Sequence, residues 1–261
     1  MITVEAMSVS YGQAAPALKP TTLSFERGAF TVLLGASGAG KSTLLRALNG
    51  LVKPTSGTVT TADFGTLSGG ASLRNHRRRT GMIFQQHQLI GRSSVLENVL
   101  MGRLGYHGSL RTLLPPGREE RLKALAAIER VGLIDYALRR ADQLSGGQQQ
   151  RVGIARALVQ QPDVILADEP IASLDPATAD AVLSLIHGIA KQDGLTAVVS
   201  LHQLDFARRF ADRIIGLARG EVVFDGRPAD LGELDITRLY QTAPMQGAEQ
   251  HPEQSPMDLV A

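Results

Sequence analysis

The segment GASGAGKST at residues 35–43 has the residue types and spacing of a phosphate-binding loop. Glycines allow successive backbone N–H groups to face phosphate oxygens, and the start of a following helix adds the positive end of its dipole. The Lys41 ammonium can reach the β- and γ-phosphates, and the Ser42 hydroxyl can bind Mg²⁺. The expected nucleotide contacts are Gly35, Ala36, Ser37, Gly38, Ala39, Gly40, Lys41, Ser42 and Thr43. The segment predicts binding of a nucleoside triphosphate.

Two adjacent acids follow a second apolar run, in VILADEP at residues 164–170. Four apolar residues place Asp168 at the carboxyl end of a buried strand, the edge at which α/β sheets bind their ligands. Asp168 is expected to hold the Mg²⁺, directly or through water. Glu169 is placed to polarise an attacking water. Together with the phosphate-binding loop, these acids predict hydrolysis of the bound triphosphate.

Short apolar runs alternate with helical patterns and would position these groups. Buried strands are expected at 30–35, 164–168, 196–200 and 213–217, and a helix at 41–49 with Leu44, Leu45 and Leu48 on its buried side and Gly50 after its end. A further helix is indicated between these strands by four residues at helical spacing. Those residues are Ala177, Ala181, Leu185 and Ile189. The fold class is therefore α/β, with a mostly parallel sheet covered by helices on both faces.

The remaining segments differ from this core. Residues 1–33 and 56–65 favour an antiparallel β subdomain, and 221–226 a hairpin return. Residues from about 88 to 152 have helical patterns, interrupted at 115–117, and the tail from 241 to 261 has the composition of a disordered segment. We therefore expect one domain over residues 1–240 with an inserted α-helical subdomain at about 88–152.

Composition narrows the function classes. Of 261 residues, 43% are hydrophobic and 20% charged, as in globular proteins, and the absence of cysteine excludes disulfides, thiolate metal sites and cysteine nucleophiles. No apolar run approaches the length of a membrane span, and the N-terminus has no secretion signal, so a cytoplasmic location is expected. The net charge of +2 gives no indication of nucleic-acid binding.

The octapeptide LSGGQQQR at residues 144–151 lies upstream of the two acids. Its two glycines ahead of a helical pattern make a second anion-binding helix start, with the Ser145 hydroxyl as an additional donor. With these motifs in this order, the chain resembles the nucleotide-binding subunit of an ABC transporter over residues 1 to about 240. The resemblance implies a P-loop NTPase core of the RecA-like kind. A similar LSGG at residues 67–70 lacks the following Gln and Arg and is expected to be a surface loop.

The resemblance assigns roles to further residues. Tyr11 would stack on adenine, and His202 would contact the γ-phosphate. Gln85 would approach Mg²⁺ beside Ser42 and Asp168, although Gln86 makes this assignment ambiguous by one residue. The catalytic set would be Glu169, His202 and Gln85. Contacts across a dimer would come from the loop Ser173-Leu174-Asp175 and from the signature residues Ser145, Gly146, Gly147 and Gln148.

The same resemblance implies the partners. Two copies of the chain would enclose two ATP molecules, with Mg²⁺, and would act with two membrane-spanning permease subunits and a periplasmic or lipid-anchored solute-binding protein. The chain would be peripheral, on the cytoplasmic face of the inner membrane, and would bind no nucleic acid. Segments 81–106 and 201–226 are most similar to phosphonate importers. The alternatives are an importer of a phosphate ester, amino acid or other small solute, a soluble ABC ATPase acting on nucleic acid or ribosomes, and a P-loop kinase.

Basic residues concentrate in the middle of the chain. Between Arg74 and Arg140 there are 13 Lys and Arg against 5 Asp and Glu, a local charge of +8, while the rest carries 14 against 20, or −6. One interpretation is a solvated helical face. The other is that Arg92, Arg103 and Arg111 contact lipid phosphates or the permease.

Overall fold

A six-stranded sheet forms the centre of the computed structural model, which describes residues 1–12, 15–86, 88–107 and 115–240. The hairpin partner β10 is antiparallel to β9, and the other neighbouring strands are parallel. In spatial order the strands are β10 (Glu221–Gly226), β9 (Arg213–Ala218), β3 (Phe30–Leu34), β8 (Thr196–Leu201), β7 (Val164–Ala167) and β6 (Thr80–Ile83). This confirms the predicted α/β class and the strands expected from the apolar runs. The edge strand β6 was not among the predicted strands.

The central strands β3 and β8 are buried throughout because both faces of the sheet are covered. Every residue of β3 is buried. Phe30, Val32 and Leu34 face a core shared with the larger helices, whereas Leu33 faces the core shared with α1 (Lys41–Leu48). Two apolar cores therefore lie on opposite sides of one sheet.

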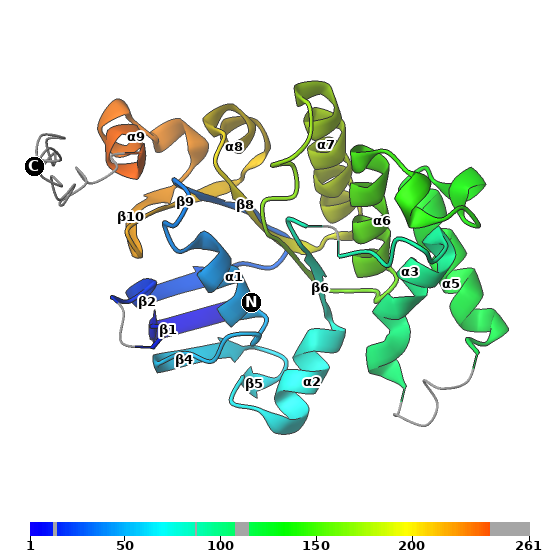
Figure 1. Cartoon of the computed structure of the whole chain (residues 1–261). Coiled ribbons are helices and arrows are strands. Elements are labelled where there is room, and N and C mark those ends of the chain that lie inside the picture. The colour runs from blue at the N-terminus through cyan, green and yellow to red at the C-terminus, as the bar shows by residue number, and fades with distance from the viewer. Residues whose placement is uncertain (13–14, 87, 108–114, 241–261) are drawn as a thin grey trace, which may run out of the picture.

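A second, antiparallel sheet covers the α1 side, as Figure 1 shows. Its spatial order is β2 (Leu18–Phe25), β1 (Ile2–Val9), β4 (Ser56–Thr61) and β5 (Gly65–Thr66). This confirms the predicted antiparallel β subdomain. Its first part, expected over residues 1–33, ends before β3, which belongs to the core sheet. A short helix, α2 (Gly70–Arg78), connects this sheet to β6.

Helices gather beyond the β6 edge of the core sheet (Figure 1). They are α3 (Val95–Leu100), the 3₁₀ segments at Met101–Tyr106, Ile134–Tyr136 and Ala141–Gln143, α5 (Arg118–Arg130) and α6 (Gly146–Leu158). Because α6 continues to Leu158, it runs past the expected limit of the helical segment at about residue 152. The last helices are α7 (Pro176–Asp193), α8 (Leu204–Phe210), a 3₁₀ turn at Pro228–Asp230 and α9 (Glu233–Tyr240).

Burial confirms one predicted helical face and corrects another. Leu44, Leu45 and Leu48 of α1 are all buried, and Gly50 follows the helix with φ of 63°. The helix α7 exists where the spacing of four residues predicted it, but of those four only Ile189 is buried. The buried face instead consists of Ala179, Val182, Leu183, Ile186, Ile189 and Ala190. The predicted stripe also had helical spacing, and only the packing partners of α7 distinguish the two.

Candidate functional site

Strand register brings the predicted chemistry to one edge of the core sheet. Ala167 of β7 is paired with Ile83 of β6 and with Val199 of β8, and Leu34 of β3 is paired with Leu201 of β8. The residues that follow these strands are the phosphate-binding loop, Gln85, the two acids and His202. Because the strands are parallel, these residues leave the sheet at the same carboxyl edge.

The phosphate-binding loop connects β3 to α1 and is shaped by glycine. Gly40 has φ of 105°, and a Cβ there would lie 2.7 Å from the Ala17 carbonyl oxygen, so a larger residue would force backbone to move. As the first residues of α1, Lys41, Ser42 and Thr43 have N–H groups without acceptors in the preceding turn. Those donors and the dipole of α1 fit the cradle predicted for phosphate oxygens.

Lys41 is buried beneath this loop. Its ammonium donates to the carbonyl oxygens of Gly35 at 2.7 Å and Ala36 at 3.0 Å, and lies 3.4 Å from Glu169 Oε1. Its side chain is only 3% exposed. The cation is therefore held between the loop and the acidic residue, where the phosphates of a bound nucleotide would compete with Glu169 for it.

Ser42 and Asp168 meet at the start of α1. The Ser42 hydroxyl donates to Asp168 Oδ1 at 2.7 Å, and Arg46 approaches Asp168 Oδ2 at 3.9 Å. A hydroxyl and a carboxylate beside a phosphate loop are the oxygen donors that Mg²⁺ uses together with phosphate and water. These two residues therefore fit a magnesium site.

Glu169 follows Asp168 at the edge of the sheet and is partly exposed. Its backbone φ of 45° lies in the left-handed region, which is uncommon for a residue with a side chain and is often found at functional sites. Its N–H donates to Ser200 Oγ at 2.8 Å. Sequence reasoning did not single out Ser200, whose one visible signal is a hydroxyl near the carboxyl end of the strand.

The other predicted contacts of this site differ in how firmly they are held. The Tyr11 hydroxyl lies 3.4 Å from Thr43 Oγ1, so this ring is beside the phosphate-binding loop with 49% of its surface exposed. His202 is exposed, and its carbonyl oxygen accepts a hydrogen bond from the Tyr240 hydroxyl at 2.7 Å. Gln85 and Gln86 are both exposed after β6, so the one-residue ambiguity between them remains.

The predicted signature begins α6. Ser145 is the N-cap, its hydroxyl accepts from the Gln148 N–H at 3.3 Å, and the Gln148 side chain accepts from the Ser145 N–H at 3.0 Å. Figure 1 shows α6 with the other helices beyond β6, well separated from α1. The signature residues therefore do not join the phosphate-binding loop of the same chain.

The similar LSGG at residues 67–70 has another local structure. Gly69 is the N-cap of α2 without a side-chain hydrogen bond, and Gly70 begins the helix. The expectation of a surface loop therefore holds for residues 67–69 and is wrong for Gly70. Without a serine cap, this helix start lacks the hydroxyl that distinguishes the signature.

The loop at residues 173–175 lies between the acids and α7. Asp175 is the N-cap of α7 and accepts from the Thr178 N–H at 3.0 Å, and hydrogen bonds from Thr178 lower the pKa of Asp175. A Cβ on Gly147 would lie 2.4 Å from Thr178 Cγ2. The signature therefore packs closely against the start of α7, beside Asp175.

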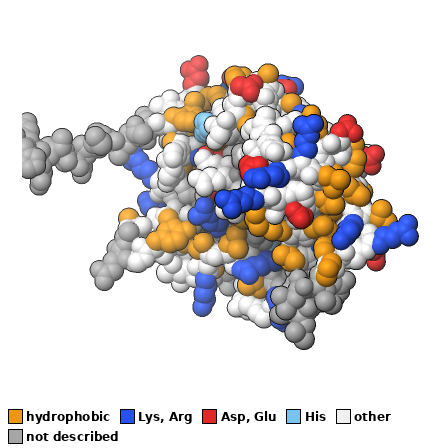
Figure 2. Space-filling view, turned by 45° about the vertical axis from the view of Figure 1, so that its right-hand side comes forward, with side chains coloured by type: hydrophobic (Ala, Val, Ile, Leu, Met, Phe, Trp, Pro, Cys, Tyr) orange, Lys and Arg blue, Asp and Glu red, His pale blue; other side chains and the backbone are white. Residues whose placement is uncertain are grey.

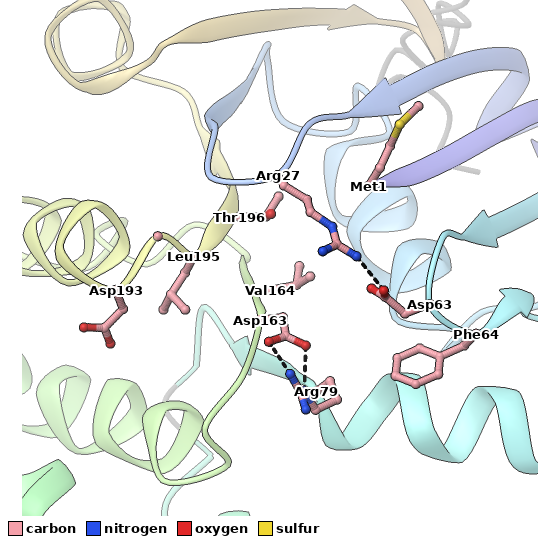
Figure 3. A pocket seen from close by; sticks show the side chains of 11 residues that line it. Met1, Arg27, Asp63, Phe64, Arg79, Asp163, Val164, Asp193, Leu195 and Thr196 are labelled. Atoms are coloured by element: carbon pink, nitrogen blue, oxygen red, sulfur yellow. Dashed lines mark hydrogen bonds and ion pairs between the residues drawn. The ribbon is translucent and has the colours of Figure 1, made fainter.

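A cavity of about 390 Å³ lies at the opposite edge of the core sheet, where β7 and β8 begin (Figure 3). Its walls include the ion pairs Arg27–Asp63 and Arg79–Asp163, both with 2.5 Å contacts. These charges are already paired with each other. The cavity lies between the two sheets and is separate from the predicted chemistry.

Packing distributes the charge of the basic segment. Arg79, Arg130 and Arg140 form ion pairs with Asp163, Asp193 and Asp142, acids that lie outside residues 74–140. Figure 2, which brings the helices forward, shows basic side chains interspersed with acidic and apolar ones. The charge excess of the sequence therefore does not form one continuous basic face in this view.

Arg103 corrects one interpretation of that segment. It is 6% exposed, and its guanidinium binds both carboxylate oxygens of Glu120, at 2.6 and 3.3 Å. It is a buried structural group, so the expectation that it contacts lipid or permease is wrong. Arg92 is exposed, and Arg111 lies outside the described residues.

Comparison with known proteins agrees with this geometry. A profile of the ABC transporter family matches residues 18–172, more than half of the chain. The chain is 59% identical over 240 residues to the phosphite import ATP-binding protein PxtA of Stutzerimonas stutzeri, covering 92% of this chain and 87% of that protein. It is 53% identical over 243 residues to the phosphonates import ATP-binding protein PhnC 3 of Nostoc sp., covering 93% of both.

Solved structures give the same result for the fold. A dimeric ATP-binding cassette in a post-hydrolysis state with ADP and phosphate aligns with a TM-score of 0.77 at 36% identity, covering 87% of this chain and 99% of that one. A nucleotide-free cassette from an ABC transporter aligns with a TM-score of 0.78 at 28% identity, covering 92% and 94%. The fold is that of a P-loop NTPase, and the chain belongs to the ABC transporter family as one of its ATP-hydrolysing subunits.

Proposed function

We propose that this chain hydrolyses ATP to drive import of phosphonates. The observation that carries the proposal is the convergence of Lys41, Ser42, Asp168 and Glu169, linked by contacts of 2.7 to 3.4 Å at the carboxyl edge of the sheet. The high identity to import ATP-binding proteins supports the transport role.

The chemistry follows from the positions of these side chains. The loop N–H groups and the Lys41 ammonium bind the β- and γ-phosphates, which releases Glu169 from Lys41. Glu169 then orients and polarises a water whose oxygen attacks the γ-phosphorus, and the bond to the bridging oxygen of ADP breaks. Ser42 and Asp168, with Gln85, would hold Mg²⁺, which would supply positive charge beside the phosphates. Tyr11 stacks on the adenine, and His202 contacts the γ-phosphate.

The active unit is a homodimer. Because the signature residues lie apart from the phosphate-binding loop of their own chain, a second copy supplies Ser145, Gly146, Gly147 and Gln148 to each nucleotide, with Asp175 at the same interface. ATP binding joins the two copies, and loss of the γ-phosphate weakens the bridge, so the closed state prefers ATP over ADP.

Glu169→Gln tests this sandwich. The variant should bind ATP and Mg²⁺, hydrolyse it at least about 100-fold more slowly, and elute as a stable dimer in gel filtration with light scattering. The wild type with ADP is the monomeric control. Elution of the variant as a monomer with ATP and Mg²⁺ would contradict the sandwich.

Two permease subunits and a solute-binding protein complete the proposed importer. A groove of about 340 Å³ between α2 and the 3₁₀ segment at Met101–Tyr106 offers a docking place for the permease, because arginines form one wall and apolar residues the other. The exposed Arg74 is the clearest test: Arg74→Glu should weaken co-purification with the permease and leave ATP binding unchanged. Equal co-purification would exclude this groove.

The location and domain limits are part of the proposal. No helix in the described part of the chain is long and apolar enough to cross a bilayer. We place the chain peripherally at the cytoplasmic face of the inner membrane, held there by the permease, with residues 1–240 as one ATPase domain and the helical insertion at about 88–152.

Growth of a deletion strain separates the solutes. The strain, lacking other uptake systems for the same compounds, is supplied with a phosphonate, phosphite or inorganic phosphate as sole phosphorus source. Loss of growth on phosphonate, restored by wild type but not by Glu169→Gln, would support the proposal. Loss confined to phosphite would favour the second candidate, which the 59% identity to a phosphite import protein supports.

A further inference from the structure

A buried hydroxyl connects the two acids of the site. Ser200 lies near the carboxyl end of β8 and is 0% exposed. Its Oγ accepts the N–H of Glu169 at 2.8 Å and donates to Asp168 Oδ1 at 3.0 Å. Since a backbone amide can only donate and an ionised carboxylate can only accept, the direction of both bonds is fixed. One side chain therefore restrains the side chain of Asp168 and the backbone of Glu169.

The restraint acts on a residue with unfavourable backbone geometry. Glu169 has φ of 45°, in the left-handed region that a residue with a side chain rarely adopts. The neighbouring Asp168 N–H is held by the carbonyl oxygen of Ile83 at 2.9 Å. The bond to Ser200 is the corresponding restraint on the Glu169 N–H, and it sets the direction in which the Glu169 side chain leaves the strand.

The same hydroxyl orients the Asp168 carboxylate. Oδ1 receives hydrogen bonds from both Ser42 and Ser200, whereas Oδ2 faces Arg46 at 3.9 Å. Ser200 is a buried residue of β8 and not part of the phosphate-binding loop, so its hydrogen bond to Asp168 does not depend on the loop's contacts with nucleotide.

We propose that Ser200 is a positioning residue for ATP hydrolysis: its hydroxyl fixes the Asp168 carboxylate and the Glu169 backbone in one arrangement. This inference rests on the roles proposed above for Asp168 and Glu169. It assigns no contact with nucleotide to Ser200, which acts through its two neighbours.

Hydrogen exchange of the nucleotide-free protein tests the link directly. Ser200→Ala should speed exchange of the Glu169 amide by about tenfold, the size expected for losing a hydrogen bond. Ser200→Thr, which keeps the hydroxyl, should exchange like the wild type. Thr196→Ala is the matched control, because it removes another buried hydroxyl from β8, one that accepts from the Gly28 N–H at 3.2 Å at the strand's other end.

Steady-state kinetics tests the consequence. Ser200→Ala should lower kcat about tenfold or more, as for loss of a hydrogen bond to a charged group, raise the Mg²⁺ concentration needed for half-maximal activity, and leave the KM for ATP within about twofold. Ser200→Thr should restore kcat. Thr196→Ala should change neither kcat nor the Mg²⁺ requirement.

The outcomes are distinguishable. Unchanged Glu169 exchange in Ser200→Ala, or an equal loss of kcat in Thr196→Ala, would overturn the role of Ser200. If Ser200→Ala does not fold, Ser200→Cys, with a sulfur that hydrogen-bonds weakly, takes its place with the same expectations. Failure of the proposed function would instead be seen as retained ATP hydrolysis in Glu169→Gln. That result does not depend on how the Glu169 amide exchanges in Ser200→Ala.

Discussion

The buried ion pair between Arg103 and Glu120 leads to a quantitative prediction. Their side chains are 8% and 12% exposed, the guanidinium also donates to the Val159 carbonyl oxygen at 3.4 Å, and it lies 3.8 Å from the centre of the Tyr106 ring. Arg103→Met would leave the Glu120 carboxylate buried and without its main partner. Removing one member of a buried pair costs about 3–5 kcal/mol.

Urea denaturation at pH 7 measures this cost as a difference in the free energy of unfolding. Two controls define its origin. Replacing both members, Arg103→Met with Glu120→Met, should recover most of the loss because no buried charge remains. Breaking the exposed pair Arg227–Asp230 with Arg227→Met should leave the free energy of unfolding nearly unchanged.

The loss should also depend on pH. In the wild type, the hydrogen bond from Arg103 lowers the pKa of Glu120 below its ordinary value of 4.5. The stability from this group is therefore present above pH 4.5 and is lost as the pH falls through the lower folded value. In Arg103→Met, burial raises the pKa of Glu120, so protonation on acidification relieves the penalty.

The difference between wild type and variant should therefore shrink as the pH falls from 7 to 4. A loss below about 1 kcal/mol at pH 7, the range of exposed pairs, would refute the reasoning. It would also reopen the interpretation of Arg103 as a surface residue.

Three further predictions concern the site. Lys41→Ala removes the cation buried under the phosphate-binding loop and should weaken ATP binding at least about tenfold in a titration with a fluorescent nucleotide, with Arg227→Ala as an unaffected control. Gly40→Ala places a Cβ 2.7 Å from the Ala17 carbonyl oxygen at a φ of 105°. The variant should lose about 1–3 kcal/mol of unfolding free energy in the same urea assay and bind ATP more weakly. Wild-type values of both quantities would exclude that contact. Tyr240→Phe removes the hydrogen bond to the His202 carbonyl oxygen and should lower kcat several-fold with little change in the KM for ATP. In a His202→Ala background the same substitution should have no additional effect on kcat. Additive losses of kcat would show that Tyr240 does not act through His202.

Local patterns predicted much of the fold because the physical causes are themselves local. Four of the five buried residues of β3 are apolar, and the glycine spacing after the strand is what a turn around phosphate requires. The α7 stripe shows the limit: alanines recur at helical spacing on several faces, and the residues that pack against the helix decide which face is buried. The edge strand β6 is too short to give a clear pattern and is recognised only by its pairing with β7.

Spacing within a few residues was enough to predict the phosphate-binding loop, the acids after a buried strand, the signature ahead of a helix and their order along the chain. Three other features appear only in the folded chain. Ser200 joins Asp168 to Glu169, Tyr240 holds the loop of His202, and Arg103 is buried against Glu120. Hydrogen-bond partners and burial depend on segments distant in sequence that packing brings together, so no local pattern contains them.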